Sequence, residues 1–101
     1  MDVFDWLTEW YEAQCDGDWE HSFGPTIDTI DNPGWSVKIE LTGTDCDGRT
    51  MERRSENYEH QTDWRTCWVE DNIFNGTGGP RQLRPILETF RAWASPTSDP
   101  S

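Results

Sequence analysis

The sequence predicts an α+β domain in which a four-stranded antiparallel meander is flanked by an N-terminal and a C-terminal helix. Apolar side chains recur with helical spacing near both ends of the chain, over residues 3–15 and 81–94. Between these segments, short runs of alternating apolar and polar residues are separated by turn-forming residues. Because each helix has one apolar side, we expect both helices to pack on one face of the sheet and to leave the other face partly open. Function is then expected on the open face or in the loops at its rim.

The first predicted helix begins after Asp2, whose carboxylate can accept a hydrogen bond from a free N–H group of the first turn. Two adjacent apolar stripes give this helix a wide packing face. They consist of Phe4, Leu7, Tyr11 and Cys15, and of Val3, Trp6 and Trp10. The C-terminal helix has a single stripe of Leu83, Ile86, Leu87, Phe90 and Trp93. Pro85 is compatible with this helix only in its first turn, where its missing N–H has no helical partner.

Four strands are predicted, over residues 26–31, 35–41, 50–58 and 64–70. Asn32-Pro33-Gly34 joins the first two, because Pro fixes φ and Gly accepts a positive φ in a tight turn. Asp47-Gly48 is typical of a type I′ hairpin and predicts the turn between the second and third strands. The third strand is polar, so we expect it at an edge of the sheet.

Residues 72–80 are rich in glycine and are predicted to form a loop. A phosphate-binding loop is excluded, because no Gly-Lys-Ser/Thr sequence follows. The length of 101 residues suits one domain. We expect that domain to span residues 1–94 and the Pro- and Ser-containing segment 95–101 to be a flexible tail.

The charge of the chain restricts its partners. There are 20 acidic and 8 basic residues, which give a formal net charge of −12. Binding to nucleic acid or to an anionic membrane depends on clustered Lys and Arg, so neither is expected. An acidic surface would instead attract a basic partner. The alternative is that the charge serves solubility alone.

The cysteines indicate a reducing compartment. Cys15, Cys46 and Cys67 are widely spaced and form no Cys-x-x-Cys pair, so zinc and thioredoxin-like motifs are absent. The sequence also shows no signal-peptide pattern and no long apolar run. We therefore expect a cytoplasmic protein with free thiols and no membrane-spanning segment.

The polar segment after the first helix holds the candidate functional side chains. Cys15 and His21 could form a nucleophile and base if they lay within hydrogen-bond reach. However, Cys15 also belongs to an apolar helix stripe, where a structural thiol is common.

The carboxylates of the same segment imitate the start of a calcium loop. Asp16, Asp18 and Glu20 have the required alternation, but His21 replaces the glycine at the sixth position and Ile27 the glutamate at the twelfth. We therefore expect no metal ion and no other cofactor. The preferred interpretation is an acidic loop whose carboxylates cap nearby N–H groups.

Two tryptophans flank this region. Trp35 begins the clearest strand pattern and is predicted to pack in the core. Trp19 lies among acidic residues and is the better candidate for an exposed interface anchor.

The chain carries a long motif, Trp6-Leu7-x-x-Trp10-Tyr11-x-x-Gln14-Cys15-Asp16-Gly17-Asp18-Trp19-Glu20-His21, followed by Thr29-Ile30-Asp31-Asn32-Pro33-Gly34-Trp35. Later come Trp68, Phe74-x-Gly76 and Leu83-x-x-Ile86-Leu87-x-x-Phe90-x-x-Trp93. In these motifs the chain resembles the immunity protein 53 family of bacterial polymorphic toxin systems, over nearly its whole length except the tail.

The resemblance implies a small bacterial protein that binds and neutralises a toxin and so protects the cell that produces both. It assigns no catalytic residue to this chain. From the residues themselves we infer a toxin-binding set of Asp16, Asp18, Trp19, Glu20, His21 and Asp31. A basic nuclease toxin, whose nucleic-acid groove an acidic inhibitor could occupy, would suit the net charge. The alternative function is that of a small enzyme using Cys15 and His21.

Overall fold

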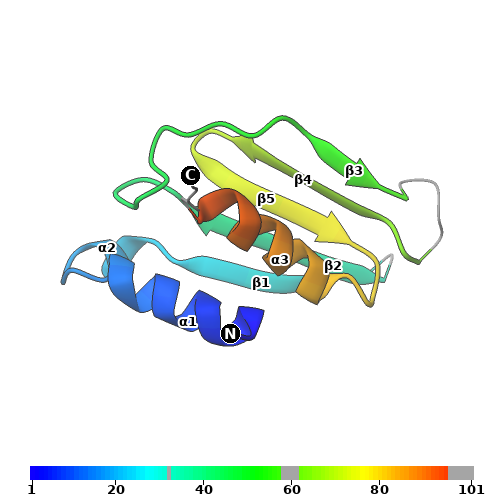
Figure 1. The fold of residues 1–101 in the computed structure, drawn as a ribbon, viewed down its shortest axis with the longest axis horizontal. Coiled ribbons are helices and arrows are strands. Elements are labelled where there is room, and N and C mark those ends of the chain that lie inside the picture. The colour runs from blue at the N-terminus through cyan, green and yellow to red at the C-terminus, as the bar shows by residue number, and fades with distance from the viewer. Residues whose placement is uncertain (32, 58–61, 96–101) are drawn as a thin grey trace.

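The computed structural model describes residues 1–31, 33–57 and 62–95 (Figure 1). Its helices are α1 (Val3–Gln14), α2 (Trp19–Ser22) and α3 (Leu83–Ala94). Its strands are β1 (Pro25–Ile30), β2 (Gly34–Glu40), β3 (Arg54–Glu56), β4 (Arg65–Glu70) and β5 (Ile73–Gly78). The predicted α+β class, the antiparallel sheet and the two terminal helices are confirmed.

The strands form one five-stranded sheet in the order β1-β2-β5-β4-β3, and every neighbouring pair is antiparallel. The predicted four-stranded meander is wrong in this respect, because residues 73–78 form a strand and not a loop. That strand, β5, occupies the centre of the sheet between β2 and β4. Both β5 and β4 therefore lie between β2 and β3, which correspond to the second and third predicted strands and were expected to be neighbours.

Residues Asp71 and Asn72 make the hairpin that returns the chain from β4 into β5. Both have positive φ angles, 55° and 63°, and Glu70 pairs with Ile73 across them. Two central residues with positive φ define a type I′ turn, and Asp and Asn adopt this conformation more readily than other non-Gly residues. The Asp71-Asn72 turn is therefore a local sequence signal that a strand follows it, and this signal comes before the glycines of β5.

The predicted hairpin at Asp47-Gly48 is wrong, although a turn does form there. The N–H of Arg49 donates to the carbonyl of Cys46 at 3.0 Å, and Gly48 has a φ of 81°. The segments on either side do not pair with each other, because β2 pairs with β1 and β5. The third strand is shorter than predicted, but β3 does lie at the edge of the sheet, as expected.

Gly34 is required for a different reason from the predicted one. It is not among the residues with positive φ. Instead, a Cβ at this position would overlap the carbonyl oxygen of Gly78. Asn32, the first residue of the predicted turn, lies outside the described residues.

The two long helices begin as the sequence predicts. The side chain of Asp2 accepts a hydrogen bond from the N–H of Phe4 at 3.0 Å and caps α1. Pro85 is the third residue of α3 and so lies in its first turn. The predicted tail lies outside the described residues except for its first residue, Ser95. None of the helices in the described part of the chain has the length and apolarity that crossing a bilayer requires.

Aromatic side chains join α1, α3 and the sheet into one core. Phe90 of α3 contacts Trp10 of α1 edge to face, with ring centroids 5.1 Å apart, and Phe74 of β5 at 4.9 Å. Val37 and Ile39 of β2 are completely buried in the same cluster. Both helices therefore use the sheet face that carries Val37, Ile39 and Phe74 (Figure 1).

Candidate functional site

The acidic segment between α1 and α2 caps its own backbone. One carboxylate oxygen of Asp16 accepts from the N–H groups of Asp18 and Trp19, both at 2.9 Å. The two oxygens of Glu20 accept from the N–H groups of Asp16 and Gly17, at 3.0 and 2.9 Å. The predicted capping loop is therefore confirmed, and Asp16 and Glu20 hold its shape.

These hydrogen bonds favour the ionised carboxylates. The pKa of Asp16 is lowered, chiefly by the N–H of Trp19 and then by that of Asp18. The pKa of Glu20 is also lowered, first by its own N–H and then by those of Asp16 and Gly17. The turn thus keeps a fixed pair of negative charges at the surface.

Trp19 is part of the core and not an exposed anchor. Its side chain is 5% exposed, and its indole N–H donates to the carbonyl of Thr42 at 2.9 Å. The ring meets Trp10 edge to face at 6.3 Å. The inference that Trp19 is exposed at an interface is therefore wrong, because the short helix α2 turns the ring inward. Trp35, predicted to be in the core, is half-buried and packs against it.

The structure does not join Cys15 to His21. The thiol of Cys15 donates to the carbonyl of Tyr11 at 3.3 Å, one helical turn back. His21 is exposed, and within the described ranges no hydrogen bond connects its ring with the thiol. In the same part of the chain, no three His, Cys, Asp or Glu side chains are grouped closely enough to hold a metal ion.

His21 and Glu20 line a cleft at the end of the open sheet face. Lys38, Glu40 and Ile73 form its opposite wall, and its volume is about 450 Å³. Charges of both signs face this cleft, so it favours neither an anion nor a cation.

Asp31 stands apart from the other predicted contacts. It follows the last residue of β1, whereas α2 precedes the first residue of this strand. Six extended residues span about 20 Å. Asp18 and Asp31 are both exposed, but they lie at opposite ends of β1.

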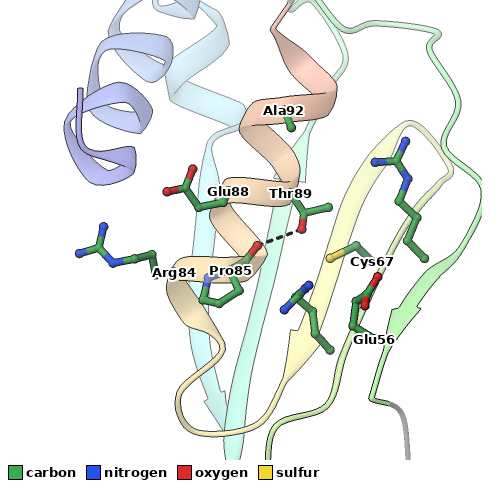
Figure 2. Close-up of a pocket in the computed structure, with 9 residues that line it drawn as sticks. Glu56, Cys67, Arg84, Pro85, Glu88, Thr89 and Ala92 are labelled. Carbon is green, nitrogen blue, oxygen red and sulfur yellow. Dashed lines mark hydrogen bonds between the residues drawn. The ribbon is translucent and has the colours of Figure 1, made fainter.

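A second pocket is a groove between α3 and the outer strands, with a volume of about 500 Å³ (Figure 2). Arg54, Glu56, Arg65 and Glu88 line it, so its charge is mixed. Arg65 is engaged with the side-chain oxygen of Gln82 at 2.7 Å.

Arg84 and Cys67 also line this groove, but neither supplies a reactive group to it. Figure 2 shows Arg84 directed toward α1, where it forms an ion pair with Asp2. Burial raises the pKa of the Cys67 thiol to about 11, so the thiol is protonated at neutral pH. The groove therefore offers no activated nucleophile.

The segment that forms α1, α2 and β1 is strongly acidic, although Arg84 and Arg91 of α3 lie against the N-terminal half of α1. The chain before Lys38 contains nine Asp and Glu residues and no Lys or Arg. The same stretch holds every exposed large hydrophobic side chain of the described residues, namely Met1, Phe4, Tyr11, Phe23 and Ile27. Sequence reasoning passed over this coincidence, although the missing basic residues and the helix stripe that contains Phe4 and Tyr11 were visible signals.

Two of these side chains, Tyr11 and Phe23, border a shallow groove between α1 and the start of β1. We call it the α1–β1 seam and define it by Leu7, Thr8, Tyr11, Phe23, Gly24, Pro25 and Ile27. All of them except Ile27 line a cavity of about 350 Å³. Ile27 lies two residues after Pro25 on the same face of β1, opposite Val37 of β2.

A small α+β domain with a strongly acidic, partly apolar side is typical of a protein that binds another protein. The profile of the family described as "Immunity protein 53" matches residues 4–95. The chain belongs to this family, whose members are immunity proteins directed against a toxin. Neither the curated proteins nor the solved structures gave a significant match to the chain.

Proposed function

We propose that this protein acts in the bacterial cytoplasm and neutralises its cognate toxin by binding it one to one through the acidic side formed by α1, α2 and β1. The observation that carries the proposal is the absence of any Lys or Arg before Lys38, together with nine carboxylates in that stretch. Such a surface attracts a basic protein and disfavours other acidic surfaces. A basic nuclease is the toxin class that fits, because its nucleic-acid groove must be positively charged.

The predicted contact residues take different parts in this proposal. Asp18 and His21 are exposed and contact the toxin. Asp16 and Glu20 hold the turn that presents them. Asp31 contributes at the far end of β1, whereas the burial of Trp19 removes it from the contact set.

Titration calorimetry against the toxin domain encoded beside this protein tests the proposal. The titrations are made at about 0.05 M and 0.5 M salt, because the higher concentration shortens the Debye length to a few ångströms. One-to-one binding that weakens in high salt is the expected result. Binding that is insensitive to salt would retain immunity but exclude the acidic surface as its basis, and no binding would reject this toxin as the partner.

A further inference from the structure

We propose that the α1–β1 seam is the centre of the toxin interface, and that it receives a basic surface of the toxin carrying an apolar side chain. The inference rests on the proposed function and locates it on the molecule. An apolar centre surrounded by a charged rim is the usual anatomy of a protein–protein interface.

The apolar centre is accessible in the free protein. Tyr11, Phe23 and Ile27 are 37%, 38% and 39% exposed, and they come from α1, from the end of α2 and from β1. Large hydrophobic side chains left accessible together on a soluble domain mark interaction sites. Aromatic side chains such as Tyr11 are also the residues on which binding energy concentrates.

Buried Trp19 supports this centre from beneath. Its ring centroid lies 5.8 Å from that of Tyr11 and 6.4 Å from that of Phe23. The indole is itself fixed by its hydrogen bond to Thr42. The seam is therefore preorganised, and little side-chain entropy is lost when a partner docks.

The rim of the seam selects a basic partner. Asp5 and Glu12 are exposed on α1, one helical turn before and after Thr8 of the seam. Residues 5–27, which hold this rim and the seam, contain no Lys or Arg, and the arginines of α3 contact α1 at Phe4 and Trp6. The groove beside α3 differs, because Arg54 and Arg65 stand among its glutamates and would repel a cationic surface.

A matched pair of charge reversals tests the rim. Glu12→Lys and Glu88→Lys change the net charge equally, and both residues are exposed on a long helix. If only total charge mattered, both variants would lose the same affinity for the toxin domain. We expect the Kd to rise about tenfold or more for Glu12→Lys and less than about threefold for Glu88→Lys.

A second pair tests the apolar centre without changing charge. Ile27→Ala truncates the side chain that faces the seam, and Ile30→Ala truncates one on the opposite face of the same strand. We expect Ile27→Ala to raise the Kd about tenfold at both salt concentrations and Ile30→Ala to leave it nearly unchanged. Circular dichroism and thermal unfolding confirm that each variant is folded before its Kd is compared.

The outcomes separate this inference from the proposed function. If the wild type binds the toxin, and the two variants of each pair weaken this binding equally or not at all, the seam is overturned but immunity is retained. If the two charge-reversal variants differ in Kd but the two isoleucine variants do not, the apolar centre is overturned. Failure of the wild type to bind the toxin rejects the proposed function for that toxin, and the seam with it.

Discussion

Gly76 of β5 lies directly beneath Ile86 of α3, so close that a Cβ at position 76 would overlap Cγ2 of Ile86. The glycine thus allows the helix to rest on the central strand of the sheet. Gly76→Ala would force α3 away from the sheet or displace Ile86. We expect the free energy of unfolding to fall by about 1–3 kcal/mol, the range for an overpacked core, as measured by urea denaturation.

A double-mutant cycle checks this cause. Ile86→Ala alone should cost about 2–5 kcal/mol, because it leaves a cavity at a fully buried position. In the double variant the new methyl group at position 76 occupies part of that cavity, so its cost should be less than the sum of the two single costs. Additive costs would show that the destabilisation by Gly76→Ala has another origin.

Side-chain hydrogen bonds of Asn72 connect the long loop after β2 to the hairpin between β4 and β5. Its amide nitrogen donates to Thr42 and to Asp47, both at 2.9 Å, and its amide oxygen accepts from the N–H of Gly48 at 3.0 Å. It also holds a φ of 63°, which disfavours alanine. Asn72→Ala should therefore destabilise the protein by about 2 kcal/mol or more.

Asn72→Gly separates the two contributions, because glycine tolerates the positive φ but cannot make the hydrogen bonds. We expect its thermal unfolding midpoint to fall between those of the wild type and the alanine variant. A glycine variant as stable as the wild type would show that the three side-chain hydrogen bonds contribute nothing.

The sequence predicted those elements whose signals are local. The cap at Asp2, the position of Pro85 in the first turn of α3 and the alternation from Trp35 to Leu41 each depend on neighbouring residues, and the structure agrees with all three. The glycines of β5 led to the wrong prediction of a loop, because they are required by tertiary packing and not by a turn. A glycine that makes room for Ile86 has the same local appearance as a glycine in a loop.

The candidate site was predicted less well for a related reason. The carboxylates of Asp16 and Glu20 were expected to cap N–H groups, and they do. The burial of Trp19, however, depends on Trp10 and Thr42. Neither residue is its near neighbour in the sequence, and only the fold brings them into contact with its side chain. Likewise, the seam exists only because α1 lies beside the start of β1.

The capping role of Asp16 predicts a dependence of stability on pH. Its pKa in the folded protein is below the ordinary value of 3.8, so the native state binds this proton less readily than the unfolded state. The stabilisation by the carboxylate is therefore present above pH 4 and is lost as the pH falls through the lowered native pKa. Asp16→Asn keeps an oxygen acceptor but no charge, so the stability difference from the wild type should shrink as the pH falls from 7 to about 3.

Asp18→Asn is the matched control, since Asp18 makes no side-chain cap to α2. Its stability is compared with that of the wild type by urea denaturation over the same pH range, and the difference should not follow the profile of Asp16→Asn, because Asp18 caps no N–H group of α2. Equal pH profiles for the two variants would contradict the capping role of Asp16.

The three cysteines should differ sharply in reactivity. Cys46 and Cys67 are 0% and 1% exposed, and burial raises the pKa of both thiols, whereas Cys15 is only half-buried. At pH 7.5, iodoacetamide should therefore modify Cys15 first in the folded protein and all three thiols after denaturation, as peptide mass spectrometry can show. Rapid modification of Cys67 in the folded protein would mean that the groove beside α3 opens.

Replacing the accessible thiol of Cys15 also distinguishes a binding protein from an enzyme. The thiol of Cys15 donates to the carbonyl of Tyr11, and serine can make the same hydrogen bond. Cys15→Ser should therefore protect cells that express the toxin as well as the wild type does, with an unchanged Kd for the toxin domain. A variant that folds and binds normally but no longer protects would favour a small enzyme acting through Cys15, because only a chemical step would then be missing.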